Sequence, residues 1–349
     1  MLLPKPRPFD RAAESAARAR LDDLTKPPGS LGKLENLAAW WAGATGRFPP
    51  PPPEKARCCV FAGDHGVVAQ GVSPYPSEVT VQMVRNFLAG GAAVNVFARH
   101  HGVELVVIDV GVSGDVGGSF STSFLDRKVA RGTADMTRGP AMTRAQAEAA
   151  VDVGIACAAQ AAADGVQLLA AGEMGIGNTT SAAAVLSAVT AMPGKLTAGR
   201  GTGVDDAGLQ RKIAAIDAAL ALHDPARDDA WAILQAVGGF EIAAIAGLCI
   251  GGAAHGVPVV VDGFISTAGA LIAHVFDRDV TPHVLVSHRS AENAHWAMSR
   301  YLGKEPLHDL DLRLGEGTGA VLAVDSVRLA AKVLVDMATF SGAGVSGRA

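Results

Sequence analysis

A single acidic residue stands among glycines near the end of the chain, in the run Leu312 to Gly319. Glu316 lies between Gly315 and Gly317, directly before a segment with helical character. Glycines at these positions permit unusual backbone angles and let a substrate approach closely. A glutamate held near apolar neighbours can have a raised pKa and accept a proton as a general base. The residue is equally consistent with an exposed loop acid stabilised by the following helix N-terminus.

A glycine-rich run over residues 172–180 follows an apolar segment and opens a predicted helix. Such turns let backbone N–H groups approach a phosphate, and the helix N-terminus adds a favourable dipole. The run has the glycine spacing of a P-loop through Gly177, but Asn178 stands where the lysine belongs. Gly175 begins a dinucleotide fingerprint that Thr180 breaks. The run therefore predicts a loop for one phosphate, with a plain strand-to-helix turn as the alternative.

A second glycine loop, Gly199 to Gly203, can contribute to the same phosphate site. Gly201 offers a further N–H group, and Lys212 can supply the positive charge that the first loop lacks. Taken alone, a single lysine is more typical of a solvated helix face. Adjacent acids at Asp205 and Asp206 follow a glycine-rich segment, and no threonine-containing phosphate loop comes after them. This order argues against free phosphoribosyl pyrophosphate as the substrate.

The elements that must position these loops are short apolar runs alternating with helical segments. The predicted strands are Arg57 to Ala62, Glu104 to Val110, Val166 to Ala171, Val257 to Val261 and His283 to Val286. The predicted helices are Asp10 to Leu21, with Asp10 as the cap, then Lys33 to Gly43, Val79 to Arg99, Thr143 to Ala163, Thr179 to Val189 and Val321 to Phe340. This alternation predicts an α/β fold with a mainly parallel sheet covered on both faces.

Most of the predicted strands end in a glycine followed by a polar residue. In open α/β sheets the ligand crevice lies beyond the carboxyl ends of the strands. The strand ends can therefore bring together Asp64, Asp109, Glu173, Asp262 and His288. Such residues, together with His65, can also bind a divalent metal, so a metal-dependent hydrolase is an alternative. Against it, the histidines lack tight ligand spacing.

Composition excludes several classes of function. The chain has 349 residues, 30 Lys and Arg against 34 Asp and Glu, and only 5% aromatic residues, so it lacks the basic and aromatic surface of a nucleic-acid-binding protein. The apolar stretches are interrupted too often to form a membrane-crossing helix. Four cysteines without a Cys-x-x-Cys pair, and an N-terminus without an apolar signal region, predict buried thiols in a cytoplasmic protein.

Six motifs in order resemble one family of enzymes. They are residues 24–32 (LTKPPGSLG), 63–67 (GDHGV), 172–180 (GEMGIGNTT), 261–264 (VDGF), 287–290 (SHRS) and 315–317 (GEG). Each motif is weak alone, but the combination over most of the chain is specific. The chain is thus similar to the nicotinate-nucleotide–dimethylbenzimidazole phosphoribosyltransferases.

The resemblance implies a reaction, a fold and an assembly. Nicotinate mononucleotide and 5,6-dimethylbenzimidazole would give α-ribazole 5′-phosphate, nicotinate and a proton, with inversion at the anomeric carbon, for the lower nucleotide loop of cobalamin. The implied fold is a Rossmann-like large domain, residues 54–304, with a small helical domain from both termini, residues 1–50 and 305–349. The family is homodimeric and needs no metal or cofactor, and neither a nucleic acid nor a membrane is an expected partner.

The resemblance also implies roles for individual residues. Glu316 matches the general base, and Glu173 matches a second acid near the base pocket. The phosphate surroundings match Gly175, Gly177, Asn178, Gly201 and Lys212, and less certain positions around the nucleotide match Asp262 and Ser290. The helix after Tyr75, Pro76 and Ser77 should form a wall of the benzimidazole pocket, where neither Ser77 nor Met83 can be given a contact.

Two further alternatives remain beside the metal-dependent hydrolase. A non-catalytic nucleotide-binding module accounts for the glycine loops but gives Glu316 no task. A dehydrogenase is disfavoured because the dinucleotide fingerprint is broken. Release of nicotinate that depends on an added benzimidazole separates the transferase from both.

Overall fold

A parallel β-sheet forms the centre of the molecule. The computed structural model describes residues 1–117 and 123–346. Within them, six parallel strands are arranged in the order β3-β2-β1-β4-β5-β6. The strands are β1 (Ala56–Gly63), β2 (Val103–Gly111), β3 (Phe124–Asp126), β4 (Leu168–Met174), β5 (Val259–Val261) and β6 (Val284–Val286). This order reverses direction between β1 and β4, as in a doubly wound Rossmann-like sheet, and it confirms the predicted fold class.

Alternate residues of each strand face opposite layers of helices, because successive side chains of a strand point to opposite faces. In β1, Cys58 and Val60 belong to one apolar cluster, whereas Cys59 and Phe61 belong to the other. All four cysteines are buried and free, as predicted. Burial on both faces explains why the strands are continuous apolar runs rather than alternating ones.

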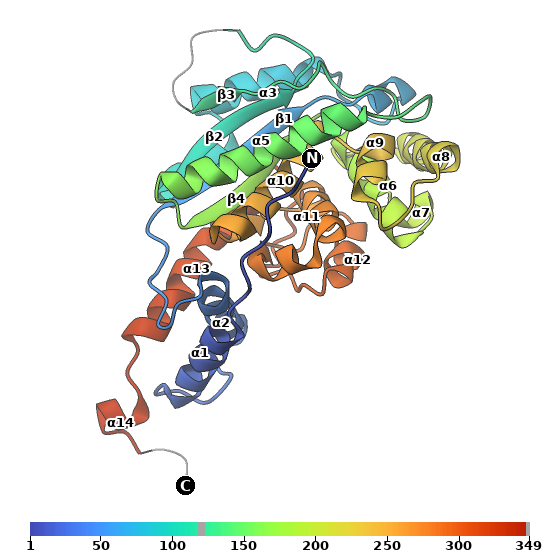
Figure 1. Ribbon diagram of the computed structural model, residues 1–349. Coiled ribbons are helices and arrows are strands. Elements are labelled where there is room, and N and C mark those ends of the chain that lie inside the picture. The colour runs from blue at the N-terminus through green and yellow to red at the C-terminus, as the bar shows by residue number, and fades with distance from the viewer. Residues whose placement is uncertain (118–122, 347–349) are drawn as a thin grey trace.

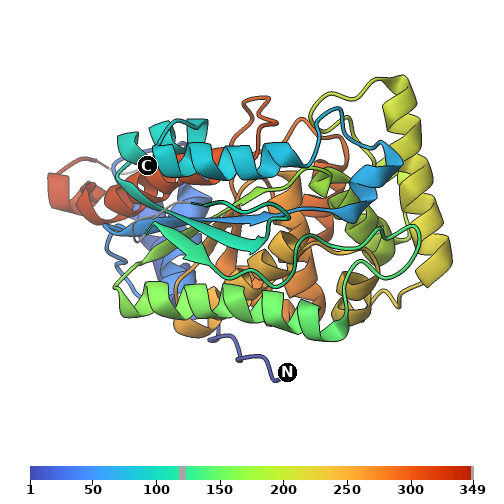
Figure 2. The ribbon, with the colours of Figure 1, turned by 90° about the horizontal axis from the view of Figure 1, so that it is seen from above.

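The helices form a layer on each face of the sheet, and Figure 2 shows the strands between α3 and α5. One cluster contains residues of α1 (Arg11–Asp23), α2 (Lys33–Thr45), α3 (Glu78–Ala89), α4 (Ala93–His100) and α13 (Thr318–Asp336). The other contains residues of α5 (Arg144–Ala163), α6 (Asn178–Thr190), α8 (Asp206–His223), α9 (Ala230–Val237), α10 (Phe240–His255), α11 (Phe264–Phe276) and α12 (Ala294–Tyr301). The shorter helices are η1 (Gly66–Gln70), α7 (Gly194–Thr197), η2 (Arg278–His283) and α14 (Phe340–Ala343).

Local sequence explains several boundaries and corrects one prediction. Asp10 caps α1 by accepting a hydrogen bond from the Ala13 N–H at 2.9 Å, as expected. The single helix predicted over Val79 to Arg99 is wrong, because Gly90 adopts a φ of 79° and ends α3. The chain then starts α4 after Ala92. A glycine in the left-handed region is a common helix stop, and it outweighs the apolar periodicity that continues through it.

Helices α5 and α10 pack backbone to backbone on one face of the sheet. A Cβ atom on Gly154 would lie 1.8 Å from the Ala244 carbonyl oxygen, and one on Gly247 would lie 2.0 Å from the Val151 carbonyl oxygen. Two glycines thus set the distance between these helices. The abundance of Ala and Gly in the sequence reflects this close packing, in which the extra volume of a side chain has nowhere to go.

The two ends of the chain meet in one helical layer. α1 and α2 pack on each other and on α13, and Leu24 forms an isolated bridge with Thr339. Figure 1 shows α13 leading from the sheet toward α1 and α2, with α14 beyond them. The division into residues 54–304 and the two terminal segments stays a prediction. None of the described helices combines the length and apolar character needed to span a membrane.

We expect Gly154→Ala to lower the free energy of unfolding by about 3 kcal/mol, the scale of an overpacked core, because α5 and α10 must move apart. The control is Gly139→Ala, since a Cβ atom on Gly139 meets no atom within 4 Å. Urea unfolding of both variants checks the expectation, and equal stabilities would contradict the close-packing argument.

Candidate active site

A cavity opens at the carboxyl ends of β4 and β5, beside the point where the strand order reverses. Its volume is about 440 Å³. Among the residues predicted from the sequence, it is lined by Glu173, Gly175, Asn178, Gly201, Ser290 and Glu316. A smaller adjoining cavity is lined by Gly177 and Lys212, together with Gly175 and Asn178. The glycine loops and the isolated glutamate therefore lie around one connected site.

Glu316 is held in an unusual backbone conformation. Its φ is 65°, and the flanking Gly315 and Gly317 have φ values of 86° and 93°. A glutamate in the left-handed region costs free energy, and such residues persist where the surrounding structure fixes them. Here the turn presses against the end of β4, since a Cβ atom on Gly172 would lie 2.4 Å from the Glu316 carbonyl oxygen.

The Glu316 side chain is buried, with 6% of the residue exposed. Its Oε2 atom has no hydrogen-bond partner among the described residues. Burial raises the pKa of this carboxyl above its usual value, and a hydrogen bond from the Val94 backbone opposes the rise. A buried carboxylate with an unsatisfied oxygen at a cavity wall is suited to accept a proton.

Glu173 lies against the Glu316 turn and joins it to the phosphate loop. Its Oε1 accepts a hydrogen bond from the Glu316 N–H at 3.4 Å, and its Oε2 accepts one from the Asn178 side-chain amide. Burial, with the nearby carboxylates of Asp262 and Glu241, raises the pKa of Glu173 to about 8. Glu173 is therefore largely protonated at neutral pH, whereas the sequence alone offered no reason to distinguish its charge from that of Glu316.

Asp262 does not line the cavity but is hydrogen-bonded to the turn that carries Glu316. Its two oxygens accept hydrogen bonds from Gly317 N–H and Ala320 N–H, both at 3.0 Å, at the start of α13. Burial raises the pKa of Asp262 to about 7 against these hydrogen bonds. A carboxylate at a helix N-terminus satisfies its free N–H groups, so Asp262 holds the loop that carries Glu316.

Two neutral histidines lie at the neighbouring wall, His288 in the cavity lining and His295 buried behind it. His288 lines the cavity, and its Nδ1 lies 2.9 Å from Ser287 Oγ and 3.6 Å from Asp262 Oδ1. Burial lowers the pKa of His288 to about 4 and that of His295 to about 3. His295 Nδ1 accepts a hydrogen bond from the Ser290 N–H at 3.0 Å, which fixes the backbone of the SHRS motif.

The glycine loop at the start of α6 has its own anchors. Gly177, with a φ of 93°, precedes α6, and the Ile176 N–H donates to Thr80 Oγ1 at 3.1 Å. Lys212 reaches across from α8, and its Nζ donates to Thr179 Oγ1 at 2.8 Å. Burial lowers the pKa of Lys212 to about 8, although the charge of Glu292 opposes this. The ammonium group thus stands at the glycine loop, where it can receive a phosphate.

Sequence analysis did not identify Glu292 as part of this site. Its Oε1 accepts a hydrogen bond from the Gly201 N–H at 2.7 Å. The N–H group that was expected to bind a phosphate is therefore already hydrogen-bonded to a carboxylate. The two residues are separated by 91 positions. No local motif reports such a contact; the only available signal was that Glu292 follows the SHRS motif by two residues.

An apolar wall completes the cavity opposite the glycine loops. Tyr75, Val79 and Met83 come from α3 and the segment before it, and Phe264 and Ile265 come from the start of α11. Helix α3 thus lines the cavity, as expected of the helix after Ser77, and its role as a wall for a benzimidazole stays a prediction. Met83 lines the cavity, and Ser77 is not among its lining residues. Such a surface suits a flat aromatic ring better than a charged group.

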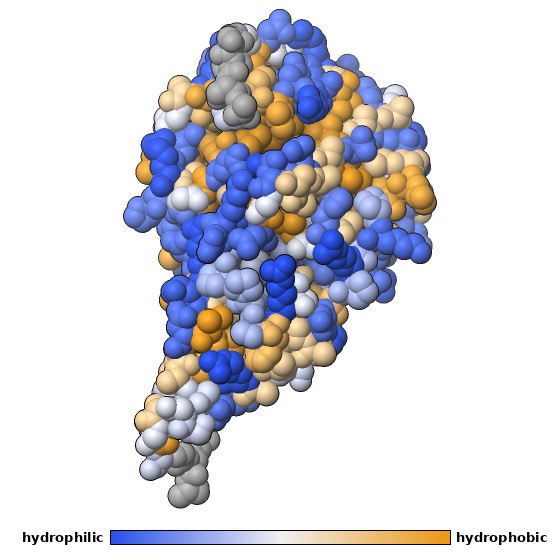
Figure 3. Space-filling view, turned by 60° about the vertical axis from the view of Figure 1, so that its left-hand side comes forward, coloured by the Kyte–Doolittle hydropathy of each residue, from blue (hydrophilic) through white to orange (hydrophobic). Residues whose placement is uncertain are grey.

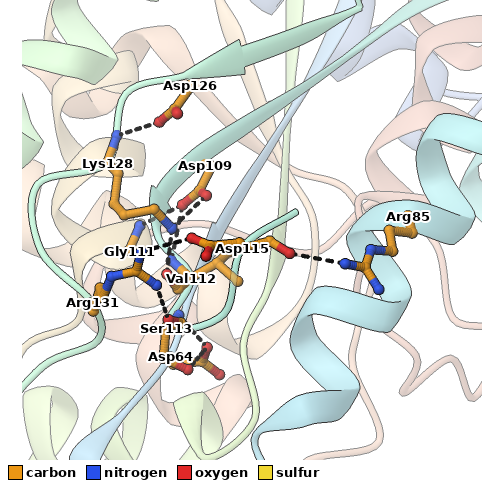
Figure 4. Close-up of polar contacts among 10 residues, drawn as sticks. All are labelled: Asp64, Arg85, Asp109, Gly111, Val112, Ser113, Asp115, Asp126, Lys128 and Arg131. Carbon is orange, nitrogen blue, oxygen red and sulfur yellow. Dashed lines mark hydrogen bonds and ion pairs between the residues drawn. The ribbon is translucent and has the colours of Figure 1, made fainter. Parts of the chain in front are cut away.

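Asp64 and Asp109 do not join the cavity, so the expected convergence of all five strand-end residues is wrong. Figure 4 shows both aspartates in a separate polar network. Asp64 Oδ2 accepts hydrogen bonds from the backbone and hydroxyl of Ser113, and Asp109 pairs with Lys128 at 2.7 Å. These carboxylates stabilise the turns that follow β1 and β2, which is an equally common use of polar residues at strand ends.

The remaining candidate metal ligand, His65, is committed to another partner. Its Nε2 lies 2.8 Å from Glu241 Oε1, and both side chains are buried. Over residues 1–117 and 123–346, no group of three or more His, Cys, Asp or Glu side chains is arranged to hold a metal ion. The dispersed positions of Asp64, His65 and Asp109 thus give the metal-dependent hydrolase no support.

Comparisons with known proteins find one family over nearly the whole chain. A family model described as phosphoribosyltransferase matches residues 7–345. The nicotinate-nucleotide–dimethylbenzimidazole phosphoribosyltransferase of Roseiflexus castenholzii is 53% identical over 97% of this chain and 96% of its own. That of Geobacter metallireducens is 49% identical over 97% and 95%. A crystal structure of the Thermus thermophilus enzyme of that name has a TM-score of 0.91 and 46% identity, covering 97% of this chain and 100% of its own.

The raised pKa of Glu173 makes a prediction about stability. A carboxyl whose pKa rises on folding favours the folded state most below its unfolded value of about 4.3, and this advantage is lost as the pH rises through about 8. We expect Glu173→Gln to flatten the fall in unfolding free energy between pH 5 and pH 8. At pH 8 the variant should be more stable than the parent by at least about 1 kcal/mol.

Urea unfolding at pH 5, 6.5 and 8 measures this slope. Glu14→Gln is the control, because the pKa of Glu14 is lowered by its pairing with Arg11 and Arg18, although partial burial opposes the shift. That variant should keep the parental slope over this range. An unchanged slope in Glu173→Gln would show that Glu173 is ionised in the folded protein.

Proposed function

The chain belongs to this phosphoribosyltransferase family, and we propose that Glu316 is the general base with which it transfers a phosphoribosyl group to a benzimidazole. The enzyme moves the 5-phosphoribosyl group of nicotinate mononucleotide to 5,6-dimethylbenzimidazole. The products are α-ribazole 5′-phosphate, nicotinate and a proton, and the reaction serves cobalamin biosynthesis. No metal or cofactor has a part in this mechanism.

One observation carries the proposal. Glu316 presents a buried carboxyl at the wall of the cavity that α3 and the glycine loop of α6 also line, and its Oε2 has no hydrogen-bond partner within residues 1–117 and 123–346. The backbone strain at this residue has no evident structural benefit, because a glycine would adopt the same φ without cost. A side chain retained at such a position is suited to a chemical task.

The chemistry needs one base and little acid. The donor carries a positively charged pyridinium ring, which departs as neutral nicotinate nitrogen without protonation. The incoming benzimidazole attacks the anomeric carbon through one nitrogen and must lose the proton of the other. Glu316 accepts that proton, and its raised pKa suits the transfer near neutral pH. Direct displacement converts the β-linked donor to the α-linked product, so inversion requires no covalent intermediate.

Glu173 has a supporting part in this scheme. It accepts the N–H of Glu316, and burial together with the nearby carboxylates of Asp262 and Glu241 raises its pKa to about 8, which keeps it largely neutral. Environments that separate the pKa values of two neighbouring carboxyls commonly divide their roles. We assign the ionised form to Glu316. Glu173 then fixes the backbone of that residue and the orientation of Asn178.

The donor phosphate is bound where the two glycine loops meet. Gly175, Gly177 and Asn178 supply the turn at the N-terminus of α6, and Lys212 supplies the positive charge. Gly201 lies beside Lys212, since a Cβ atom on Gly201 would lie 3.0 Å from Lys212 Nζ. Ser290 belongs to the cavity wall near the sugar, and Asp262 holds the turn behind that wall. Anchoring the phosphate aligns the anomeric carbon with the incoming nitrogen, and such alignment supplies much of the rate enhancement.

We also propose a cytoplasmic homodimer. Large apolar side chains are exposed at Val96 on α4 and Leu329 on α13, each 52% exposed, and at Leu314 beside the active-site turn, which is 57% exposed. Figure 3 shows apolar surface over the upper part of the visible face. Extensive exposed apolar surface favours association. The buried, free thiols are consistent with a reducing compartment.

The role of Glu316 is tested by its replacement with Ala or Gln. We expect turnover to fall by roughly 10²-fold or more, the scale of a lost general base, with donor affinity nearly unchanged. The readout is nicotinate release that depends on added dimethylbenzimidazole, and the control is Glu305→Gln at an exposed glutamate. Near-normal turnover of the folded Glu316 variants would refute the assignment.

The phosphate assignment is tested by Lys212→Ala, which should chiefly raise the apparent KM for nicotinate mononucleotide. Loss of a buried cation removes the partner of the donor phosphate, while the benzimidazole side of the cavity is untouched. Lys195→Ala, at an exposed lysine on α7, is the control. If only the KM for the benzimidazole changed, the phosphate would have to bind elsewhere.

A further inference from the structure

Glu292 places a negative charge at the position where the enzyme is expected to bind the phosphate of its donor. The Glu292 carboxylate accepts the hydrogen bond of the Gly201 N–H at 2.7 Å. Its charge also acts on Lys212, whose Nζ lies 3.0 Å from the position of a Cβ atom on Gly201. Glu292 thus accepts a hydrogen bond from one group assigned to the phosphate, the Gly201 N–H, and acts electrostatically on another, the Lys212 ammonium.

The second oxygen of Glu292 is buried in a way that excludes a simple sugar contact. Glu292 Oε2 is inaccessible and has no hydrogen-bond partner in the described part of the chain. It is packed against Gly199, where a Cβ atom would lie 1.6 Å away. A ribose hydroxyl cannot reach this oxygen unless the carboxylate first moves. The observed position of Glu292 is therefore one that a bound nucleotide would have to change.

A phosphate group and this carboxylate cannot share the site as it stands. A phosphate monoester carries about −1.5 to −2 charges near neutral pH. The Gly201 N–H and Lys212, which would bind this phosphate, already interact with the Glu292 carboxylate. A phosphate bound to the same two groups as the Glu292 carboxylate would be repelled strongly by it, because the site is partly buried. The glycine at position 199 leaves room for the carboxylate, so the arrangement is built into the two loops.

We propose that Glu292 is a competing internal anion that occupies the phosphate position in the free enzyme and is displaced when the donor binds. This inference rests on the proposed phosphate site. Displacement costs part of the binding energy of every phosphate-bearing ligand, so phosphate alone binds weakly and occupancy requires the additional contacts of a base in the rest of the cavity. Return of Glu292 to Gly201 then assists release of the phosphorylated product. On this basis Glu292 sets the affinity of the site for phosphorylated ligands and takes no part in catalysis.

Glu292→Gln tests the proposal, because glutamine keeps an oxygen for the Gly201 N–H but removes the charge. Calorimetric titration of the full-length protein should show nicotinate mononucleotide and inorganic phosphate binding about tenfold tighter than to the parent, the scale of a modest coupling between sites. Nicotinate riboside, which lacks the phosphate, should bind as before. Glu305→Gln, at a glutamate outside the cavity, should bind all three like the parent.

A second variant displaces the carboxylate without altering Glu292. Gly199→Ala introduces a methyl group where Oε2 lies, so the side chain must leave Gly201. This variant should also bind inorganic phosphate more tightly than the parent. Tighter binding in both variants supports the proposal. Because the two substitutions lie in different loops, a distortion of one loop would not explain the same gain in both variants.

Each of the following results would overturn it. Unchanged affinity for phosphate in Glu292→Gln would show that the charges do not compete. Weaker binding of both nucleotide and riboside would identify Glu292 as a sugar contact instead. If Lys212→Ala binds nicotinate mononucleotide like the parent, the phosphate site itself is misplaced and the proposed donor geometry fails with it. Weak binding by Lys212→Ala with no gain in Glu292→Gln would reject the competing anion alone.

Discussion

The active site depends on a close backbone contact between the end of β4 and the turn before α13. Gly172 has no side chain, and the Glu316 carbonyl oxygen occupies the space that a Cβ atom would need. Asp262, at the end of β5, holds the other side of this turn by accepting hydrogen bonds from the Gly317 and Ala320 N–H groups. Two strand ends thus fix one strained glutamate. Because the constraint lies in the backbone, the side chain of Glu316 remains free to meet a substrate, which is the arrangement that a preorganised base requires.

The same constraint creates an electrostatic cost. Glu173, Asp262 and Glu316 are all buried within one region, and burial raises the pKa of each. The repulsion between these carboxyls is reduced in two ways. Asp262 accepts hydrogen bonds from backbone N–H groups, and Glu173 is largely protonated at neutral pH. Neutral His288 and His295 add no positive charge to compensate. Stability is therefore lowered at the point where chemistry needs an ionised carboxyl, a common relation between active sites and folding.

Sequence patterns predicted the parts of this site that lie in continuous glycine-rich runs. Glu173 and the loop through Asn178 could be found because a strand, a glycine turn and a helix follow one another along the chain, and Glu316 could be found because it stands between glycines directly before a helix. Helix α10 escaped prediction because it is buried around nearly its whole circumference and shows no amphipathic period. Strand β3 has only three residues. Asp64 and Asp109 were misplaced because a polar residue after a strand can serve a turn as well as a ligand, and Glu292 meets Gly201 only through the folded chain.

The distribution of charge around the cavity also bears on the direction of the reaction. The donor brings a positive pyridinium ring, and after displacement the positive charge resides on the newly bonded benzimidazole until its proton leaves. Glu173, Glu292 and Glu316 line the cavity together with Arg313, and ionised carboxyls in such a cavity stabilise a cation. Were both Glu173 and Glu316 ionised, they would hold the pyridinium donor as firmly as the benzimidazolium product. Protonation of Glu173 removes part of that attraction, and ionised Glu316 takes the proton from the incoming ring alone. Removal of a proton from the benzimidazole ring then favours the forward transfer, because the pyridinium ring of the donor has no N–H proton that Glu316 could remove.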